Sequence, residues 1–196
     1  MDPSKKTDTG INLLSTDLST YNNSWYKPGT AIKRVGWFIT QIVFFRNAFL
    51  PFYGFKVFLL RLFGAKIGKG VVIKPGVRVK YPWFLEVGDF SWIGENVWID
   101  NLTKVSLGSH VCLSQGALLL CGNHDFKSVS FDLDVRPIIL ENGVWIGAQG
   151  IVVGGVTGYS HAVLTAGSVA TKDLEAYSIY QGNPALKIRN REIIHN

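Results

Sequence analysis

Residues 67–80 read IGKGVVIKPGVRVK, residues 87–100 read VGDFSWIGENVWID, and residues 107–120 read LGSHVCLSQGALLL. In each stretch an aliphatic residue recurs every six positions, as at Ile67, Ile73 and Val79. The same register returns from Leu140 and again from Gly158. Of its fifteen positions thirteen are Leu, Ile or Val, although these types supply only 54 of the 196 residues. A random placement would put about four there, so the repeat is a property of the sequence order.

A six-residue period fits neither an α-helix nor an alternating hairpin strand, and it is typical of a parallel β-helix. Each hexad supplies one short strand and one corner, and three hexads close a triangular coil. The aliphatic residue points inward and stacks on its equivalent one coil away, at about 4.8 Å. We therefore predict an all-β chain, a β-helix of about five coils that begin at residues 67, 87, 107, 140 and 158.

The repeat also divides the chain. Residues 67–186 form the β-helix domain, from which residues 125–139 are predicted to protrude as an extruded loop, and residues 187–196 form a tail. Residues 1–66 are a polar arm followed by a helical segment that caps the first coil. Pro51 and Gly54 separate two predicted helices, at about 31–48 and 52–63.

Composition and charge exclude several classes of protein. With 47% hydrophobic and 17% charged residues the chain is not disordered. The net charge of +6 comes from residues 1–66, with nine Lys/Arg against three Asp/Glu, while residues 67–196 hold eleven of each. Because the predicted β-helix is neutral, we do not expect nucleic-acid binding. The first ten residues, MDPSKKTDTG, lack the apolar core of a secretory signal, so we expect a cytoplasmic protein.

Several motifs resemble a known family. The hexads, with GNHDF at 122–126, VWIG at 144–147, LTAGSVATKD at 164–173 and YQGNPA at 180–185, are similar to hexapeptide-repeat acyltransferases. Within that family they resemble the O-acetyltransferases of colanic acid and other capsular polysaccharides. The resemblance implies a left-handed β-helix, a homotrimer with active sites between subunits, and acetyl-coenzyme A (acetyl-CoA) as donor. It also implies direct acetyl transfer to a sugar or glycan acceptor, with no metal.

His124 is the candidate catalytic residue. A sugar hydroxyl attacks a thioester poorly unless a base removes its proton, and neutral histidine suits that task. His124 lies where the third coil ends and the extruded loop begins, and the family's catalytic histidine occupies the matching place. The adjacent Asp125 is a candidate to contact the site or orient the imidazole, although a main-chain carbonyl is the preferred partner. Cys121 could suggest a covalent route, but we favour a packing role for it.

Other positions are candidates for binding. Asp100 and Asn101, at the end of the second coil, are predicted to contact the acceptor, and Trp145 to line the acyl channel. For the donor, the small residues Gly147, Ala148, Ala166 and Gly167 would let a ligand approach the main chain, while Thr171 and Lys172 match the family's residues near the nucleotide. A lysine at this place can bind phosphate.

Two questions stay open at this stage. The function could instead be acetylation of a small soluble acceptor, such as a free sugar, an antibiotic or an amino acid, or the chain could be a β-helix scaffold without that activity. The segment 25–63 holds twelve aromatic and six basic residues and no acid. We expect it mainly to cap the first coil, with peripheral contact to an anionic membrane as a second interpretation.

Overall fold

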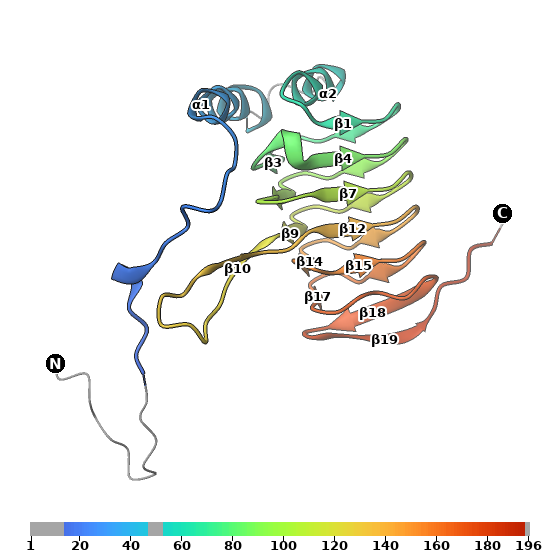
Figure 1. Ribbon diagram of the computed structural model, residues 1–196. Coiled ribbons are helices and arrows are strands. Elements are labelled where there is room, and N and C mark those ends of the chain that lie inside the picture. The colour runs from blue at the N-terminus through green and yellow to red at the C-terminus, as the bar shows by residue number, and fades with distance from the viewer. Residues whose placement is uncertain (1–13, 47–52, 195–196) are drawn as a thin grey trace, which may run out of the picture.

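The computed structural model describes residues 14–46 and 53–194, which build a parallel β-helix with helices across one end (Figure 1). Three sheets form its faces, and each coil of the chain contributes one strand to each sheet. Sheet A holds β1 (Lys66–Ile67), β4 (Leu85–Val87), β7 (Val105–Leu107), β12 (Ile138–Leu140) and β15 (Thr157–Gly158). Sheet B holds β2 (Val72–Ile73), β5 (Trp92–Ile93), β8 (Cys112–Leu113), β13 (Trp145–Ile146), β16 (Val163–Leu164), β18 (Ser178–Gly182) and β19 (Ala185–Asn190). Sheet C holds β3 (Arg78–Val79), β6 (Trp98–Asp100), β9 (Leu118–Leu120), β14 (Ile151–Val153) and β17 (Val169–Ala170).

The predicted hexad register is the core of this fold. Ile67, Val87, Leu107, Leu140 and Gly158 pair in one column of sheet A, and matching columns run through sheets B and C. All fifteen hexad positions are buried. Parallel strands in register place each aliphatic side chain directly on its equivalent in the next coil, so the interior is one continuous apolar stack.

The stack is slightly longer than predicted. After the five coils, Leu174 forms a bridge with Gly158 and β18 pairs with β16, which adds part of a sixth coil. Strand β19 then folds back antiparallel on β18 and ends the stack.

The turns between the sheets account for the positions of two histidines, His110 and His161. Between sheets A and B, and between sheets B and C, the residue three positions after each inward aliphatic has a positive φ. Glycine occupies many of these positions, but His110 (φ 58°) and His161 (φ 61°) occupy two of them. Their rings pack on Phe90 and Tyr177, with centroids 5.5 and 4.8 Å away. Both histidines therefore lie in the turns that join sheet A to sheet B, at the A/B edge of the β-helix.

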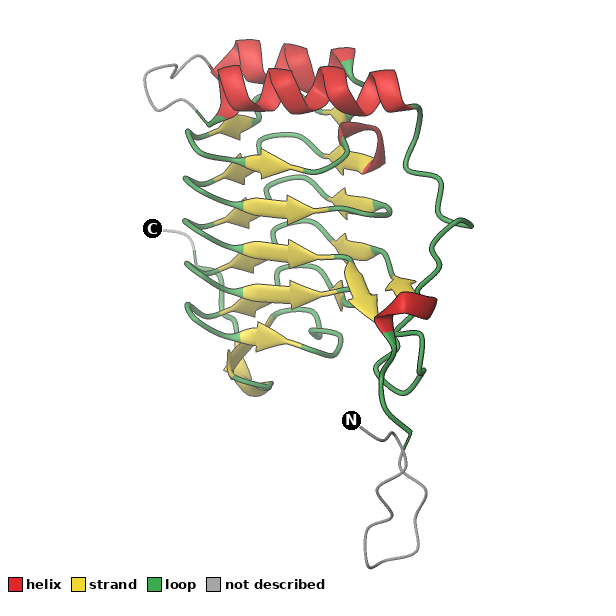
Figure 2. Cartoon of the chain, turned by 90° about the vertical axis from the view of Figure 1, so that its left-hand side faces the viewer, coloured by secondary structure: helices red, strands yellow, loops and turns green. Residues whose placement is uncertain are grey.

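Two helical stretches lie across the first coil (Figure 2). The first is α1 (Ala31–Thr40) continued by a π-helix, η2 (Gln41–Phe45), and the second is α2 (Tyr53–Leu62). Both were predicted, although the ends placed at residues 47, 48 and 52 lie outside the described residues. The Trp37 indole donates to the Val79 carbonyl at 2.7 Å, and the Gln41 amide oxygen accepts from the Val79 N–H at 2.6 Å. These bonds satisfy main-chain groups of the first coil that have no strand above them.

The third edge, between sheets C and A, carries every insertion of the first three coils. The first insertion forms a 3₁₀ turn, η3 (Pro82–Phe84), and the second spans residues 101–104. The third leaves the coil as an antiparallel hairpin of β10 (Gly122–His124) and β11 (Leu133–Val135). The excursion therefore begins three residues before the predicted loop, 125–139, and Ile138 and Ile139 belong to β12. The hairpin places His124, the candidate catalytic residue, at this C/A edge.

Candidate active site

His124 ends strand β10, where the hairpin passes into its loop, and Phe131 contacts its ring in two ways. Its Nδ1 lies 2.9 Å from the main-chain oxygen of Phe131, and the two rings stack at 4.4 Å with an angle of 10° between their planes. A carbonyl can only accept, so Nδ1 carries the proton of this hydrogen bond. In the neutral imidazole the other nitrogen, Nε2, is then a free base.

The imidazole lines a groove of about 770 Å³. One wall is the N-terminal arm, residues 14–30, which runs from the helical end of the molecule to the hairpin (Figure 2). The Asp17 N–H donates to the Val129 carbonyl at 2.8 Å, just before the short helix η1 (Leu18–Thr20), and the Tyr21 ring lies 5.9 Å from that of His124. The groove is lined by Tyr21, Asn23, Tyr26, Lys27, Pro28, Gly29, Thr30, Arg34, Lys80, Tyr81, Leu102, His124 and Leu133.

The lining is aromatic and cationic. Three tyrosine side chains and the cations Lys27, Arg34 and Lys80 face the groove, and among the residues that the structure describes no carboxylate lines it. Aromatic faces with a few polar groups are the usual walls of a site that binds a small molecule. The cations favour a ligand that carries negative charge.

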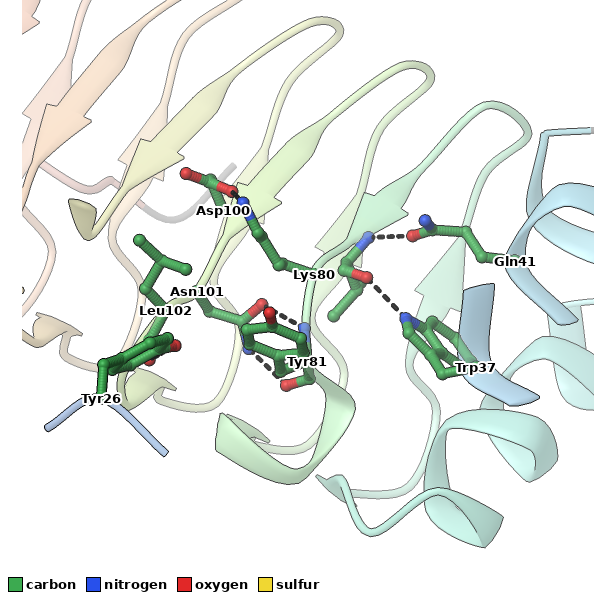
Figure 3. Close-up of polar contacts among 9 residues, drawn as sticks. Tyr26, Trp37, Gln41, Lys80, Tyr81, Asp100, Asn101 and Leu102 are labelled. Atoms are coloured by element: carbon green, nitrogen blue, oxygen red, sulfur yellow. Dashed lines mark hydrogen bonds and ion pairs between the residues drawn. The ribbon is translucent and has the colours of Figure 1, made fainter. Parts of the chain in front are cut away.

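Asp100 lies behind this lining. Its side chain is nearly buried and forms an ion pair with Lys80, whose Nζ lies 3.1 Å from Oδ1 (Figure 3). Asp100 is absent from the residues that line the groove. The carboxylate therefore sits where it can hold the Lys80 ammonium at the groove, and its direct contact with the acceptor stays a prediction.

Asn101 was also predicted to contact the acceptor, but the structure shows it fully buried. Its side-chain amide donates to the Tyr81 carbonyl at 2.6 Å and accepts from the Tyr81 N–H at 3.0 Å (Figure 3). Both polar atoms are thus used on main chain, and neither faces the groove. Asn101 shapes the C/A edge and presents the Tyr81 ring to the groove.

Asp125 and Cys121, which lie close to His124 in the sequence, have local roles. The Asp125 carboxylate accepts from the Lys127 N–H at 3.0 Å and stabilises the turn of the hairpin, while Phe131 supplies the partner of the imidazole. The Cys121 side chain is buried, and this burial raises its thiol pKa to about 12. At neutral pH that thiol is protonated and a poor nucleophile, which agrees with packing.

The predicted donor residues lie on two edges. Ala166 and Gly167 are exposed at the B/C edge, and the Gly167 N–H donates to Ala148 at 2.8 Å. Gly147 is buried there, and a Cβ on it would lie 2.5 Å from the Ala166 nitrogen, so this position has no room for a side chain. A Cβ on Gly167 would meet nothing within 4 Å, so the main chain is open to a ligand at that point.

Thr171 and Lys172 are exposed at the C/A edge, two coils beyond the one that carries His124. Within one chain, Thr171 and Lys172 therefore lie at the same edge of the β-helix as His124, between sheets C and A. Ala166 and Gly167 lie at a different edge, between sheets B and C.

Comparison with known proteins identifies the family. No family model matches the chain. The Escherichia coli K12 protein named "Putative colanic acid biosynthesis acetyltransferase WcaF" is 39% identical over 176 residues, which cover 89% of this chain and 97% of that protein. A hexapeptide-repeat acetyltransferase of Vibrio cholerae, solved with acetyl-CoA, superposes with a TM-score of 0.73 at 21% identity over 85% of this chain and 93% of that chain. The chain belongs to the hexapeptide-repeat acetyltransferases.

A second solved member, a galactoside acetyltransferase in complex with coenzyme A, has a TM-score of 0.73 at 24% identity, covering 82% of each chain. These structures confirm the predicted left-handed β-helix. Among the described residues of this acetyltransferase, no group of three His, Cys, Asp or Glu side chains could hold a metal ion.

Trp145 lies away from the groove. It is 46% exposed on the outer face of sheet B, and its indole donates to the Ser114 hydroxyl at 2.9 Å. Trp92, 61% exposed, lies in the same ladder two coils earlier, with Cys112 between them. In this single chain Trp145 thus belongs to an exposed aromatic surface on sheet B and not to the His124 groove.

Several residues at the site were not predicted from the sequence. Tyr21, Tyr26, Lys80, Tyr81 and Phe131 all lie at or beside the groove. The position of Tyr81 offered one signal, since it directly precedes the insertion of the first coil at Pro82–Phe84. The N-terminal arm, which carries Tyr21 and Tyr26, offered no such signal, because its composition does not indicate which part of the β-helix it packs against.

Proposed function

We propose that this acetyltransferase transfers the acetyl group of acetyl-CoA to a hydroxyl of a sugar in capsule or exopolysaccharide biosynthesis, in the cytoplasm. The observation that carries the proposal is the His124–Phe131 pair, because it leaves one imidazole nitrogen free as a base inside a groove of suitable size. The names of the relatives support the donor and the acceptor class. Both cysteines are free thiols, in keeping with a reducing compartment.

In the proposed reaction Nε2 of His124 accepts the proton of the acceptor hydroxyl as its oxygen attacks the thioester carbonyl. The bond from the carbonyl carbon to sulfur then breaks, and the imidazolium returns the proton to the departing sulfur. The Phe131 carbonyl holds the tautomer through both steps and stabilises the imidazolium. Cys121 takes no part, because transfer is direct.

The charge of the groove supports an anionic acceptor. Lys27, Arg34 and the Asp100-positioned Lys80 face the groove, and no carboxylate within residues 14–46 and 53–194 lines it. Cations of this kind bind phosphate or carboxylate groups. We therefore place next to the acetylated sugar a phosphate or a uronic acid carboxylate, and the tyrosine rings against the sugar itself.

The donor would extend along the β-helix. The open main chain at Ala166 and Gly167 suits the pantetheine amides, and the exposed Lys172 suits a phosphate. Since His124 and Ala166 lie on different edges of one chain, we propose that a homotrimer brings the B/C edge of one subunit to the C/A edge of the next. A thioester could then lie between Ala166 of one copy and His124 of another.

A panel of acceptors tests the function. Acetyl-CoA turnover would be measured with nucleotide sugars, lipid-linked glycans, acidic oligosaccharides, neutral free sugars, and small acceptors such as an antibiotic and an amino acid. The proposal expects an O-acetyl ester, removable by hydroxylamine, on an anionic sugar. Turnover with only the antibiotic or the amino acid would contradict it.

A further inference from the structure

The first helical stretch is apolar on two opposite faces. On the inner side Trp37 and Phe45 are 2% and 0% exposed and pack against each other and the first coil. On the outer side Ile32 and Ile39 are 87% and 56% exposed, and they lie seven residues apart on one face of α1. A helix that only capped the β-helix would carry polar residues on that outer side.

The second helix extends this surface. Phe55, Phe58 and Leu62 follow the spacing i, i+3, i+7 on α2 and are 44–66% exposed. The Phe44 ring packs edge-on against Phe55 at 5.3 Å and connects the two helices. We call the whole set the outer apolar face; it consists of Ile32, Val35, Phe38, Ile39, Ile42, Val43, Phe55, Phe58 and Leu62. Single exposed apolar residues are ordinary, but a contiguous group of this size marks an interaction surface.

The charged residues of the segment that carries this face are all basic. No Asp or Glu occurs between Asp17 and Glu86. Lys33 and Arg34 on α1 and Arg46 just after η2 are exposed, and none of them takes part in the ion pairs found among residues 14–46 and 53–194. Lys33 also lies over the Trp83 ring, 4.5 Å from its centroid, and Arg34 also lines the groove of His124. Cations beside exposed apolar side chains complement an anionic lipid surface, where the charges meet headgroups and the side chains enter the acyl boundary.

We infer that the outer apolar face docks on the surface of an anionic lipid bilayer. No helix in the part of the chain described by the structure is long and apolar enough to cross a membrane. Helices α1 and α2 instead lie across the end of the β-helix (Figure 1), so both can rest flat on a bilayer. The inference stands on exposure and charge alone and does not depend on the proposed reaction.

Docking of the outer apolar face would also bring the groove of His124 close to the bilayer. A second groove, of about 570 Å³, opens beside Val35 and Phe38 of the outer apolar face. It shares Arg34, Lys80 and Tyr81 with the groove of His124. The two grooves are thus neighbours at the C/A edge, and a bilayer under α1 would lie next to the path that leads to His124.

Vesicle flotation of the full chain tests the inference. We expect the protein to float with phosphatidylglycerol-containing vesicles at about 0.05 M salt, and much less at about 0.5 M salt or with pure phosphatidylcholine. The double variant Ile32→Gln/Ile39→Gln keeps good helix formers at exposed positions and should lower the bound fraction at least about 10-fold. A second variant, Phe58→Gln on α2, should weaken flotation as well.

The matched control is Leu186→Gln/Ile188→Gln on β19, which removes two side chains that are 68% and 51% exposed at the opposite end of the β-helix. It should float like the unmodified protein. Absence of flotation at low salt, equal flotation with pure phosphatidylcholine, or unchanged flotation of both outer-face variants would each overturn the inference. Sedimentation would show whether the outer-face variants reduce the subunit number; that result, without any flotation of the unmodified protein, would mean that a second copy covers this face.

Discussion

The imidazole of His124 is bonded through Nδ1 to the Phe131 carbonyl at 2.9 Å, and it is stacked on the ring of the same residue at 4.4 Å. The hairpin therefore fixes both the tautomer and the plane of the base from a single residue seven positions away. The hairpin loop between β10 and β11, which leaves the coil at the C/A edge, therefore supplies the partner that holds the imidazole.

Removal of the stacking ring should reduce catalysis without loss of donor binding. Phe131→Ala retains the main-chain carbonyl but frees the imidazole to tilt, and we expect kcat to fall by roughly 10-fold. The dissociation constant of coenzyme A should stay unchanged. Phe126→Ala in the same hairpin is the control, since Phe126 is 74% exposed. Equal activity of both variants would show that stacking does not position His124.

Asn101 should matter for stability more than for contact with substrate. Asn101→Leu leaves the N–H and carbonyl of Tyr81 without their partners, and such buried groups cost about 1–3 kcal/mol each. We expect the free energy of unfolding in urea to fall by about 2–4 kcal/mol. Asn142→Leu, which removes one bond from an exposed side chain, should lower it by less than about 1 kcal/mol. Equal losses for the two variants would argue against this role.

The Cys121 thiol should stay protonated and unmodified. Its pKa is raised by burial from 9.0 to about 12, so the folded state holds the proton more tightly than the unfolded chain. Its contribution to stability is therefore complete below pH 9 and disappears as the pH rises through 12. Native protein should resist iodoacetamide at Cys121 at pH 8, and Cys121→Ala should keep turnover within about threefold. An acetylated Cys121 trapped during turnover would instead establish a covalent route.

Mixed assemblies should reveal a site shared between subunits. His124→Ala and Ala166→Tyr each disable one half of the proposed site, and each homotrimer should be inactive. When the two variants are refolded together, about a quarter of the sites would combine an intact His124 with an intact Ala166 from different copies. Recovered turnover near that fraction is the expected result. No recovery, in samples shown to contain mixed trimers, would place both residues in the site of one chain.

The hexads predicted the fold well, because an inward position in a β-helix must be aliphatic in every coil. All fifteen positions are buried, and the corner positions of His110 and His161 follow from the same register. The repeat did not predict how the β-helix ends, where Leu174 and Ser178–Gly182 continue the stack without a complete hexad.

The site was harder to predict, because its contacts cross the chain without a period. The motif indicated His124, but the Phe131 carbonyl is a main-chain atom with no sequence signature. Asn101 resembled an acceptor ligand by its place, yet only the structure shows both of its amide atoms turned inward to Tyr81. Tyr21 reaches His124 because the Asp17 N–H bonds to Val129 across more than one hundred residues, and single-sequence patterns do not report such distant pairs.

The most direct test of the account is the turnover of His124→Ala with acetyl-CoA and the acceptor found in the panel, measured beside coenzyme A binding. If His124 is the general base, kcat should fall by at least about 10²-fold while the dissociation constant of coenzyme A stays the same. His110→Asn is the matched control, since Asn96 shows that asparagine tolerates the same positive φ at an equivalent corner; it should retain full activity. Near-normal turnover of His124→Ala would contradict the account.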